Sequence, residues 1–174
     1  MYLTKERGGR TLATIYRLDG VVVELPSFSR KHRVPHDLAH AVTERSLGLS
    51  RGVFGSLAAG AMFSNTQVVQ GRPRYDAAER SERILKANGR ELGFAELLAG
   101  AIHQVVEHGL VNVAAKVRHD WGVLSVDPCP YDEAQLRDAA DELDLLGRAW
   151  EQLFVGQGLE FPWPERLSAQ MMPR

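Results

Sequence analysis

Residues 36–44, with the sequence HDLAHAVTE, hold two histidines and two carboxylates directly after a proline. At about 100° per residue, His36, His40 and Glu44 fall on one side of a helix, and Asp37 falls at the edge of that side. Imidazole nitrogens and carboxylate oxygens are the usual protein ligands of zinc, and they also bind iron or manganese. The segment therefore predicts a metal site, with zinc as the first ion to expect.

A single ion cannot collect all four groups. His36 and Glu44 are separated by about 12 Å along a helix that rises 1.5 Å per residue, whereas metal–ligand bonds are about 2 Å long. His36 and His40, one turn apart, are the natural ligand pair, and further ligands must come from another segment. Asp37 and Glu44 are candidates to bind the ion, to hold an imidazole N–H, or to act as catalytic acids and bases.

A second predicted helix, over about residues 91–108, carries a similar stripe. Glu96, His103 and Glu107 lie within about 40° of one another around its axis. We expect His103 to be the third metal ligand and Glu107 to be a second catalytic carboxylate. After His103 and Glu107, the next candidate ligands are His119 or Asp120. If the protein is an enzyme of hydrolase or lyase type, a metal-activated water would be the nucleophile or base, and these carboxylates would move protons.

Basic residues gather in the segment 72–90, where six cations face three acids. Arg72, Arg74 and Arg80 are the residues that we expect to orient an anionic small-molecule substrate. The formal net charge of −1 gives no general attraction to nucleic acid or to an anionic membrane, and no aromatic residues alternate with these arginines. The predicted partner is therefore a small molecule.

The pattern around these residues predicts an α+β, mainly α fold, with an N-terminal β-hairpin followed by about four to five packed helices. Strands over 11–17 and 21–25, joined by Asp19-Gly20, form the hairpin of residues 10–25. The motif helix is expected over about 35–47, with Gly48 as its stop signal. Further helices are expected over about 51–61, 76–88 and 132–154, a loop over 65–75, and either a helix or a strand within 110–126.

The length of 174 residues, 44% of them hydrophobic, fits one domain over residues 1–174. We expect a helical body over 35–155 and an irregular tail over 156–174. Cys129 is the single cysteine, which excludes an internal disulfide. With a polar N-terminus and no run of 18 apolar residues, the sequence predicts a cytoplasmic protein without a membrane span, and it leaves a homo-oligomer open.

Two segments, VPHDLAH (34–40) and GVFGSLAAG (52–60), resemble an uncharacterised actinobacterial protein family with a PHDxxH motif. This resemblance implies no function. The pair His36-Asp37 is also similar to the motif of the HD phosphohydrolases. Their upstream histidine belongs to an earlier helix, where a hairpin is predicted here.

The HDxxH core, formed by His36, Asp37 and His40, is similar to the zinc motif of a coenzyme Q biosynthesis family. The motif of that family continues with a glycine four residues later and with a distant glutamate. Glu44 and Ser56 stand at those two positions here. The resemblance implies metal binding by the motif and chemistry on an aromatic or quinone-like ring.

A non-enzymatic interaction module is the alternative. In that interpretation the histidines and acids form an ordinary polar face, and the acidic C-terminal helix or the basic segment 72–90 docks a partner. Convergence of His36, His40 and a residue from another segment would favour the metal site over this alternative.

Overall fold

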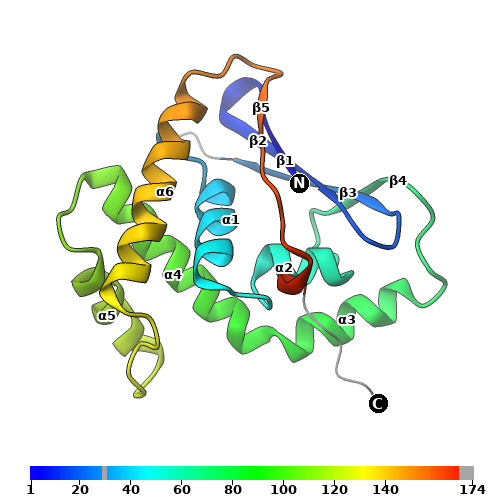
Figure 1. Ribbon diagram of the computed structural model, residues 1–174. Helices are drawn as coiled ribbons and strands as arrows, with labels where there is room; N and C mark the ends of the chain where they lie inside the picture. Colours follow the sequence, from blue (N-terminus) through cyan, green and yellow to red (C-terminus); the bar gives the residue numbers. More distant parts are fainter. Residues whose placement is uncertain (29–30, 169–174) are drawn as a thin grey trace.

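The computed structural model describes residues 1–28 and 31–168. In this part of the chain, six α-helices and a five-stranded sheet form an α+β fold in which helices predominate (Figure 1). The predicted class is confirmed. The helices are α1 (His36–Leu47), α2 (Val53–Ala59), α3 (Ala77–Ala87), α4 (Gly89–His108), α5 (Val113–Leu124) and α6 (Glu133–Glu151).

All neighbouring strands of the sheet are antiparallel, in the order β4-β3-β2-β1-β5. The strands are β1 (Tyr2–Lys5), β2 (Arg10–Tyr16), β3 (Val22–Phe28), β4 (Gln67–Gln70) and β5 (Gly158–Glu160). β2 and β3 form the predicted hairpin, with Ile15 opposite Val23. Its turn contains Gly20 at φ +78°, a conformation that an L side chain rarely adopts. Alternate residues of β2 are buried, so one face of the hairpin packs on the core.

Three short strands depart from the sequence-based expectations. β1 adds a strand before the hairpin, β4 lies within the predicted loop 65–75, and β5 lies within the predicted irregular tail 156–174. A 3₁₀ turn, Glu165–Leu167, also lies in that tail, whose last residues, 169–174, fall outside the described part. Strands of three or four residues carry too little periodicity to be recognised from the sequence. β1 and β4 are defined by pairing with the hairpin, and β5 by pairing with β1.

The predicted helix boundaries hold closely. α1 begins after Pro35 and ends at Gly48, which adopts φ +72° as a left-handed C-cap. α4 ends in the same way at Gly109, at φ +63°. The ambiguous segment 110–126 is helical, and α5 begins where the side chain of Asn112 accepts a hydrogen bond from the N–H of Ala115 at 2.8 Å.

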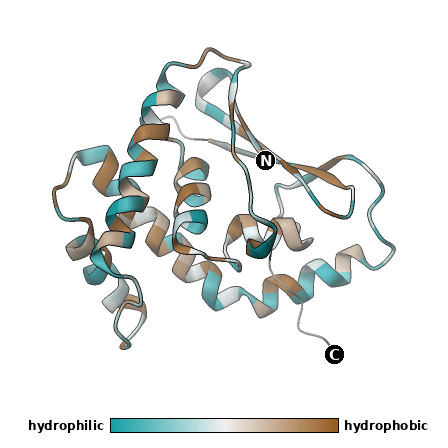
Figure 2. Cartoon of the chain, viewed as in Figure 1, coloured by the Kyte–Doolittle hydropathy of each residue, from teal (hydrophilic) through white to brown (hydrophobic). Residues whose placement is uncertain are grey.

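Helix α1 lies against both α4 and α6, which places the motif inside the helical layer (Figure 1). Its apolar residues Leu38 and Val42 are fully buried in a core that the sheet, α4 and α6 also line. Figure 2 shows hydrophilic and hydrophobic residues alternating along α3 and α6, as expected for helices that pack through one face. Among the described residues, no helix has the length and hydrophobicity needed to cross a bilayer.

Candidate metal centre

His36 and His40 lie side by side at the start of α1. Pro35, whose missing N–H costs nothing at a helix start, directs the chain into the helix so that His36 is its first residue. The two imidazole rings meet edge to face, with centroids 4.8 Å apart. The i, i+4 spacing therefore brings two nitrogen donors together, as predicted.

Glu96 of α4 completes the group. Its Oε1 lies 3.1 Å from Nε2 of His36, and its Oε2 lies 2.9 Å from Nε2 of His40. One ligand atom from each of the three residues lies within 4.8 Å of the other two. Two imidazoles and one carboxylate from two different helices thus converge on one point.

The spacing of these atoms is close to what a metal ion requires. Two ligand atoms bound about 2.05 Å from a tetrahedral ion lie about 3.3 Å apart. Nε2 of His36 and Nε2 of His40 lie 3.1 and 2.9 Å from their respective Glu96 oxygens. The three ligand atoms lie within 4.8 Å of one another, so an ion that replaces these hydrogen bonds would draw the most distant pair together by up to about 1.5 Å. The residues present therefore fit a divalent ion.

Behind this group, Glu44 fixes the orientation of His40. Oε1 of Glu44 lies 3.2 Å from Nδ1 of His40, and the Glu44 side chain is fully buried. A carboxylate accepts hydrogen bonds, so Nδ1 of His40 carries the proton at this contact. Contacts of this kind hold metal-binding imidazoles in one tautomer and leave the other nitrogen for the ion.

Glu44 is itself held by the start of α2. Its carboxylate accepts hydrogen bonds from the main-chain N–H groups of Val53 (2.8 Å), Phe54 (2.9 Å) and Gly55 (3.4 Å). These donors would otherwise lack partners at a buried helix end. A Cβ atom at Gly52 would lie 2.3 Å from the carboxyl carbon of Glu44, so this carboxylate fits only beside a glycine. Gly52 therefore has a defined role in leaving room for the carboxylate of Glu44.

Charge in the ion-free site is concentrated on His40 and Glu96. Burial opposes a charge on His40, but hydrogen bonds to Glu44 and Glu96 outweigh it and raise the pKa of His40 to about 9. Hydrogen bonds from His36 and His40 hold the pKa of Glu96 well below its usual range, against the effect of burial. A positive imidazolium thus lies between two carboxylates, and a metal ion that replaces the proton on Nε2 of His40 would be attracted by the same carboxylates.

The site is reachable from solvent on one side. The side chain of His40 is only 3% exposed, whereas those of His36 and Glu96 are 40% and 64% exposed. Solvent access is therefore limited to the side formed by His36 and Glu96. The acids Asp37 and Glu44 do not form an ordinary exposed polar face, because both are buried.

Asp37 has a local partner. Its Oδ2 accepts a short hydrogen bond from the hydroxyl of Ser27 at the end of the hairpin. Burial raises the pKa of Asp37, while the Ser27 contact opposes the rise. Asp37 therefore links α1 to β3, and it is not part of the three-residue group.

His103 and Glu107 hold the segment that leads into α1. Nε2 of His103 lies 2.8 Å from the carbonyl oxygen of Val34, and burial lowers the pKa of this histidine. Glu107 accepts hydrogen bonds from the main-chain N–H groups of Arg33 (3.1 Å) and Val34 (2.6 Å). The ring of His103 lies 5.8 Å from that of His36, next to the metal group but outside it.

The three arginines expected at a substrate site lie on another part of the chain. Arg80 donates to the carbonyl oxygen of Ala59, and Arg74 pairs with Asp76. No hydrogen bond or ion pair among the described residues joins Arg72, Arg74 or Arg80 to the histidines. The structure likewise pairs Asp120 with Lys116 in α5.

The sequence indicated the helix face that supplies the third ligand but not which residue of that face it is. Glu96 belongs to the predicted Glu96/His103/Glu107 stripe, which indeed faces α1. Spacing alone left open which of its members meets His36 and His40, because that depends on where the two helices cross. The structure brings Glu96 to the histidines and His103 to Val34.

Comparisons of the chain with protein-family models, with curated proteins and with solved structures find no match. The functional argument therefore depends on the geometry of this site.

Proposed function

We propose that the protein binds one divalent metal ion through Nε2 of His36, Nε2 of His40 and the carboxylate of Glu96. The observation that carries the proposal is the convergence of these three ligand atoms from α1 and α4, within 4.8 Å of one another. The buried carboxylate of Glu44 supports it, because it fixes the tautomer of His40 as in known metal sites.

Zinc is the ion that we expect first. Two imidazole nitrogens and one carboxylate oxygen are a common catalytic zinc set, and the same set serves non-haem iron and manganese. Such a set of three protein ligands leaves at least one coordination position for water or substrate. The exposed side of the site, formed by His36 and Glu96, gives that position access to solvent.

We further propose that the protein is a metal-dependent enzyme of hydrolase or lyase type in the cytoplasm. An ion of this kind lowers the pKa of a bound water enough for it to act as a nucleophile or base near neutral pH. In this proposal Glu44 positions His40, since both its oxygens already accept hydrogen bonds. Glu107 and His103 maintain the approach to α1, and His36 and Glu96 border the reacting position.

Metal analysis tests the proposal. The protein should be purified without chelators and without a metal-affinity tag, and its metal content measured by plasma mass spectrometry. We expect about one ion per chain in the wild type and almost none in the His36→Ala/His40→Ala double variant. Glu96→Gln should also lose the ion, while Glu91→Gln removes a carboxylate from the same helix outside the group and should retain it.

Two outcomes would overturn the proposal. One is negligible metal in the wild type even after incubation with zinc, iron or manganese. The other is equal metal content in the wild type and the double variant, which would place the ion elsewhere. Either result would leave the interaction-module interpretation as the stronger one.

A further inference from the structure

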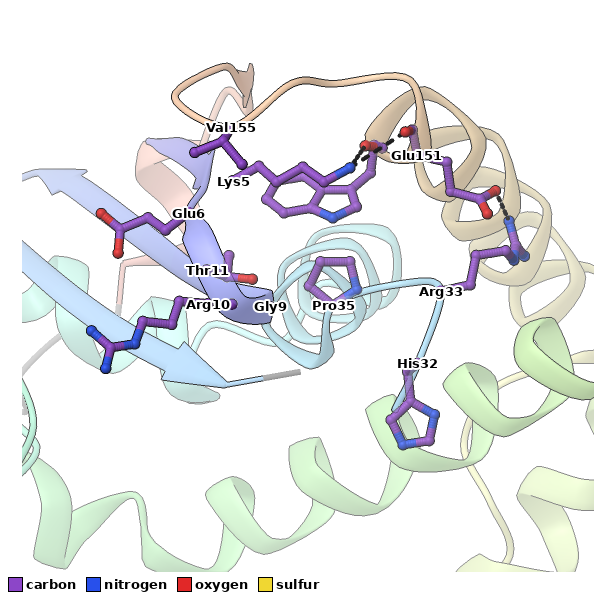
Figure 3. A pocket seen from close by; sticks show the side chains of 12 residues that line it. Lys5, Glu6, Gly9, Arg10, Thr11, His32, Arg33, Pro35, Glu151 and Val155 are labelled. Carbon is purple, nitrogen blue, oxygen red and sulfur yellow. Dashed lines mark hydrogen bonds and ion pairs between the residues drawn. The ribbon is translucent and has the colours of Figure 1, made fainter. Parts of the chain in front are cut away.

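A cavity of about 470 Å³ lies beside the metal group, between the β1–β2 turn, the start of α1 and the end of α6 (Figure 3). Cavities that hold small organic ligands typically span about 300–1,000 Å³. In Figure 3, Lys5 and Val155 lie above Pro35, and His32 lies below it. The volume is enough for an organic molecule and much larger than a single water or phosphate requires.

The charges around the cavity favour an anion. Arg33 pairs with Glu151 at 3.3 Å and with Asp144 at 2.9 Å, and Arg148 also pairs with Asp144, so these two cations and two acids leave no net charge. Nζ of Lys5 donates to the carbonyl oxygens of Trp150 (3.2 Å) and Glu151 (3.3 Å), and no carboxylate among the described residues pairs with it. Arg10 stacks over the ring of Phe28, 4.6 Å from its centroid.

Arg10 likewise has no acidic partner in the described part of the chain. Glu6 is the one remaining acid of the lining, so Lys5 and Arg10 leave an excess of positive charge. His32, on the opposite side of Pro35 from Arg10 in Figure 3, adds no excess, because its Nδ1 lies 3.9 Å from a carboxylate oxygen of Glu107. The cavity therefore attracts an oxyanion.

Apolar surface lines the rest of the cavity. Trp150 is 5% exposed, and Pro35 is buried, so both present carbon surface that is held in place by packing. Val155 adds an exposed apolar side chain at the rim. A ligand that contacts both the positively charged and the apolar part of the lining carries an oxyanion on a carbon skeleton.

The cavity adjoins the metal group through two routes. Pro35 directly precedes His36 in the chain. The ring of His32 lies 4.9 Å from the ring of His103, which in turn lies 5.8 Å from the ring of His36. The rings of His32 and His103 thus lie between the cavity and the proposed metal group.

We propose that this cavity binds an organic anion, a carboxylate or phosphate on a small apolar skeleton. Its assignment as the substrate site of the metal centre rests on the proposed function, whereas the binding of the anion does not. Arg10, and not the arginines 72, 74 and 80, would then recognise the charged group, with Pro35 and Trp150 against the carbon skeleton.

Binding should be measured by isothermal titration with protein whose metal has been removed by chelation and dialysis. The probes are phenyl phosphate, benzoate and the neutral benzyl alcohol. We expect at least one of the two anions to bind and benzyl alcohol to bind much more weakly. Preference between phosphate and carboxylate then identifies which oxyanion the cavity takes. Higher salt should weaken binding, because the attraction is partly exposed.

Two pairs of variants locate the site. Arg10→Gln should weaken anion binding about fivefold, whereas Arg7→Gln, in the same turn but outside this cavity, should not. Val155→Glu places an acid at the rim and should weaken binding similarly, whereas Phe154→Glu, at an exposed neighbour outside the lining, should not. Circular dichroism confirms that all four variants fold.

The inference is overturned if neither anion binds at millimolar concentration, if benzyl alcohol binds as well as the anions, or if the control variants lose as much affinity as their partners. Because the titrations use metal-free protein, these failures are distinct from a failure of metal binding. Metal content of Arg10→Gln, measured in parallel, should equal that of the wild type.

Discussion

Oε1 of Glu44 lies 3.2 Å from Nδ1 of His40, one helical turn earlier, and neither side chain is more than 3% exposed. Glu44 thereby connects two features of the molecule. On one side it sets the tautomer of a proposed metal ligand, and on the other it accepts three main-chain N–H groups at the start of α2. A single buried carboxylate thus couples the site to the packing of the adjacent helix.

Glu44→Gln should strongly destabilise the protein. The amide keeps one acceptor oxygen but points an NH₂ group at N–H donors, so buried donors lose their partners. Breaking a buried charged contact of this kind costs about 3 kcal/mol or more. Urea unfolding measures the loss. Glu142→Gln is the control, since Glu142 also contacts α1 through Arg45 but is partly exposed, and it should cost at most about 1 kcal/mol. Similar losses in the two variants would contradict the role given to Glu44.

Gly52→Ala should weaken both stability and metal binding. The new Cβ would lie 2.3 Å from the carboxyl carbon of Glu44, so the carboxylate must move away from the α2 start and from His40. Strain of this size in a packed region costs about 1–3 kcal/mol. Thermal unfolding and metal content are the measurements. Gly122→Ala, in α5 with no atom within 4 Å of its added Cβ, should be neutral or stabilising by up to about 1 kcal/mol. Equal behaviour of the two variants would show that Gly52 has no steric role.

The sequence predicted the half-site on α1 because helical spacing is local. His36 and His40 lie one turn apart in any α-helix, and Gly48 marks its end. The ligand on α4 could not be predicted in this way, since Glu96 and His103 are about 10 Å apart along that helix and share one face. Which of them meets His40 depends on the crossing point of α1 and α4, and that is set by packing across the whole core.

The position of Glu44 shows a second limit. Its spacing from His40 was visible in the sequence, but its burial was not, because the donors that stabilise it come from the start of α2. Gly52 was the one residue in the sequence that could have indicated this burial, although a glycine there was equally consistent with simple close packing. In the sheet, the hairpin turn at Gly20 was recognisable, whereas β5 is defined only by pairing with β1.

Stability of the metal-free protein should fall as the pH rises through about 9. The pKa of His40 is raised from an ordinary 6.5 to about 9 in the folded state, so the folded protein binds this proton more tightly than the unfolded chain does. The resulting stabilisation is fully present below about pH 6.5 and is lost as the pH rises through 9. Urea midpoints between pH 6 and pH 10 measure the trend. The difference between wild type and His40→Gln isolates it from other titrating groups, and parallel curves for the two proteins would contradict it.

His103→Gln tests which member of the α4 stripe binds the ion. Nε2 of His103 lies 2.8 Å from the carbonyl oxygen of Val34, a contact that holds the chain just before α1. Because the three-atom group contains Glu96 instead, this variant should retain the wild-type metal content while losing about 1 kcal/mol of stability from the altered buried hydrogen bond. Glu96→Gln should show the opposite pattern, with loss of the ion but little loss of stability when metal-free proteins are compared, since its side chain is 64% exposed. Metal content, and urea unfolding after removal of the metal from the same preparations, measure ion binding and stability separately. Loss of the ion in His103→Gln together with its retention in Glu96→Gln would transfer the third ligand to His103, and would require α4 to shift along α1 when metal binds.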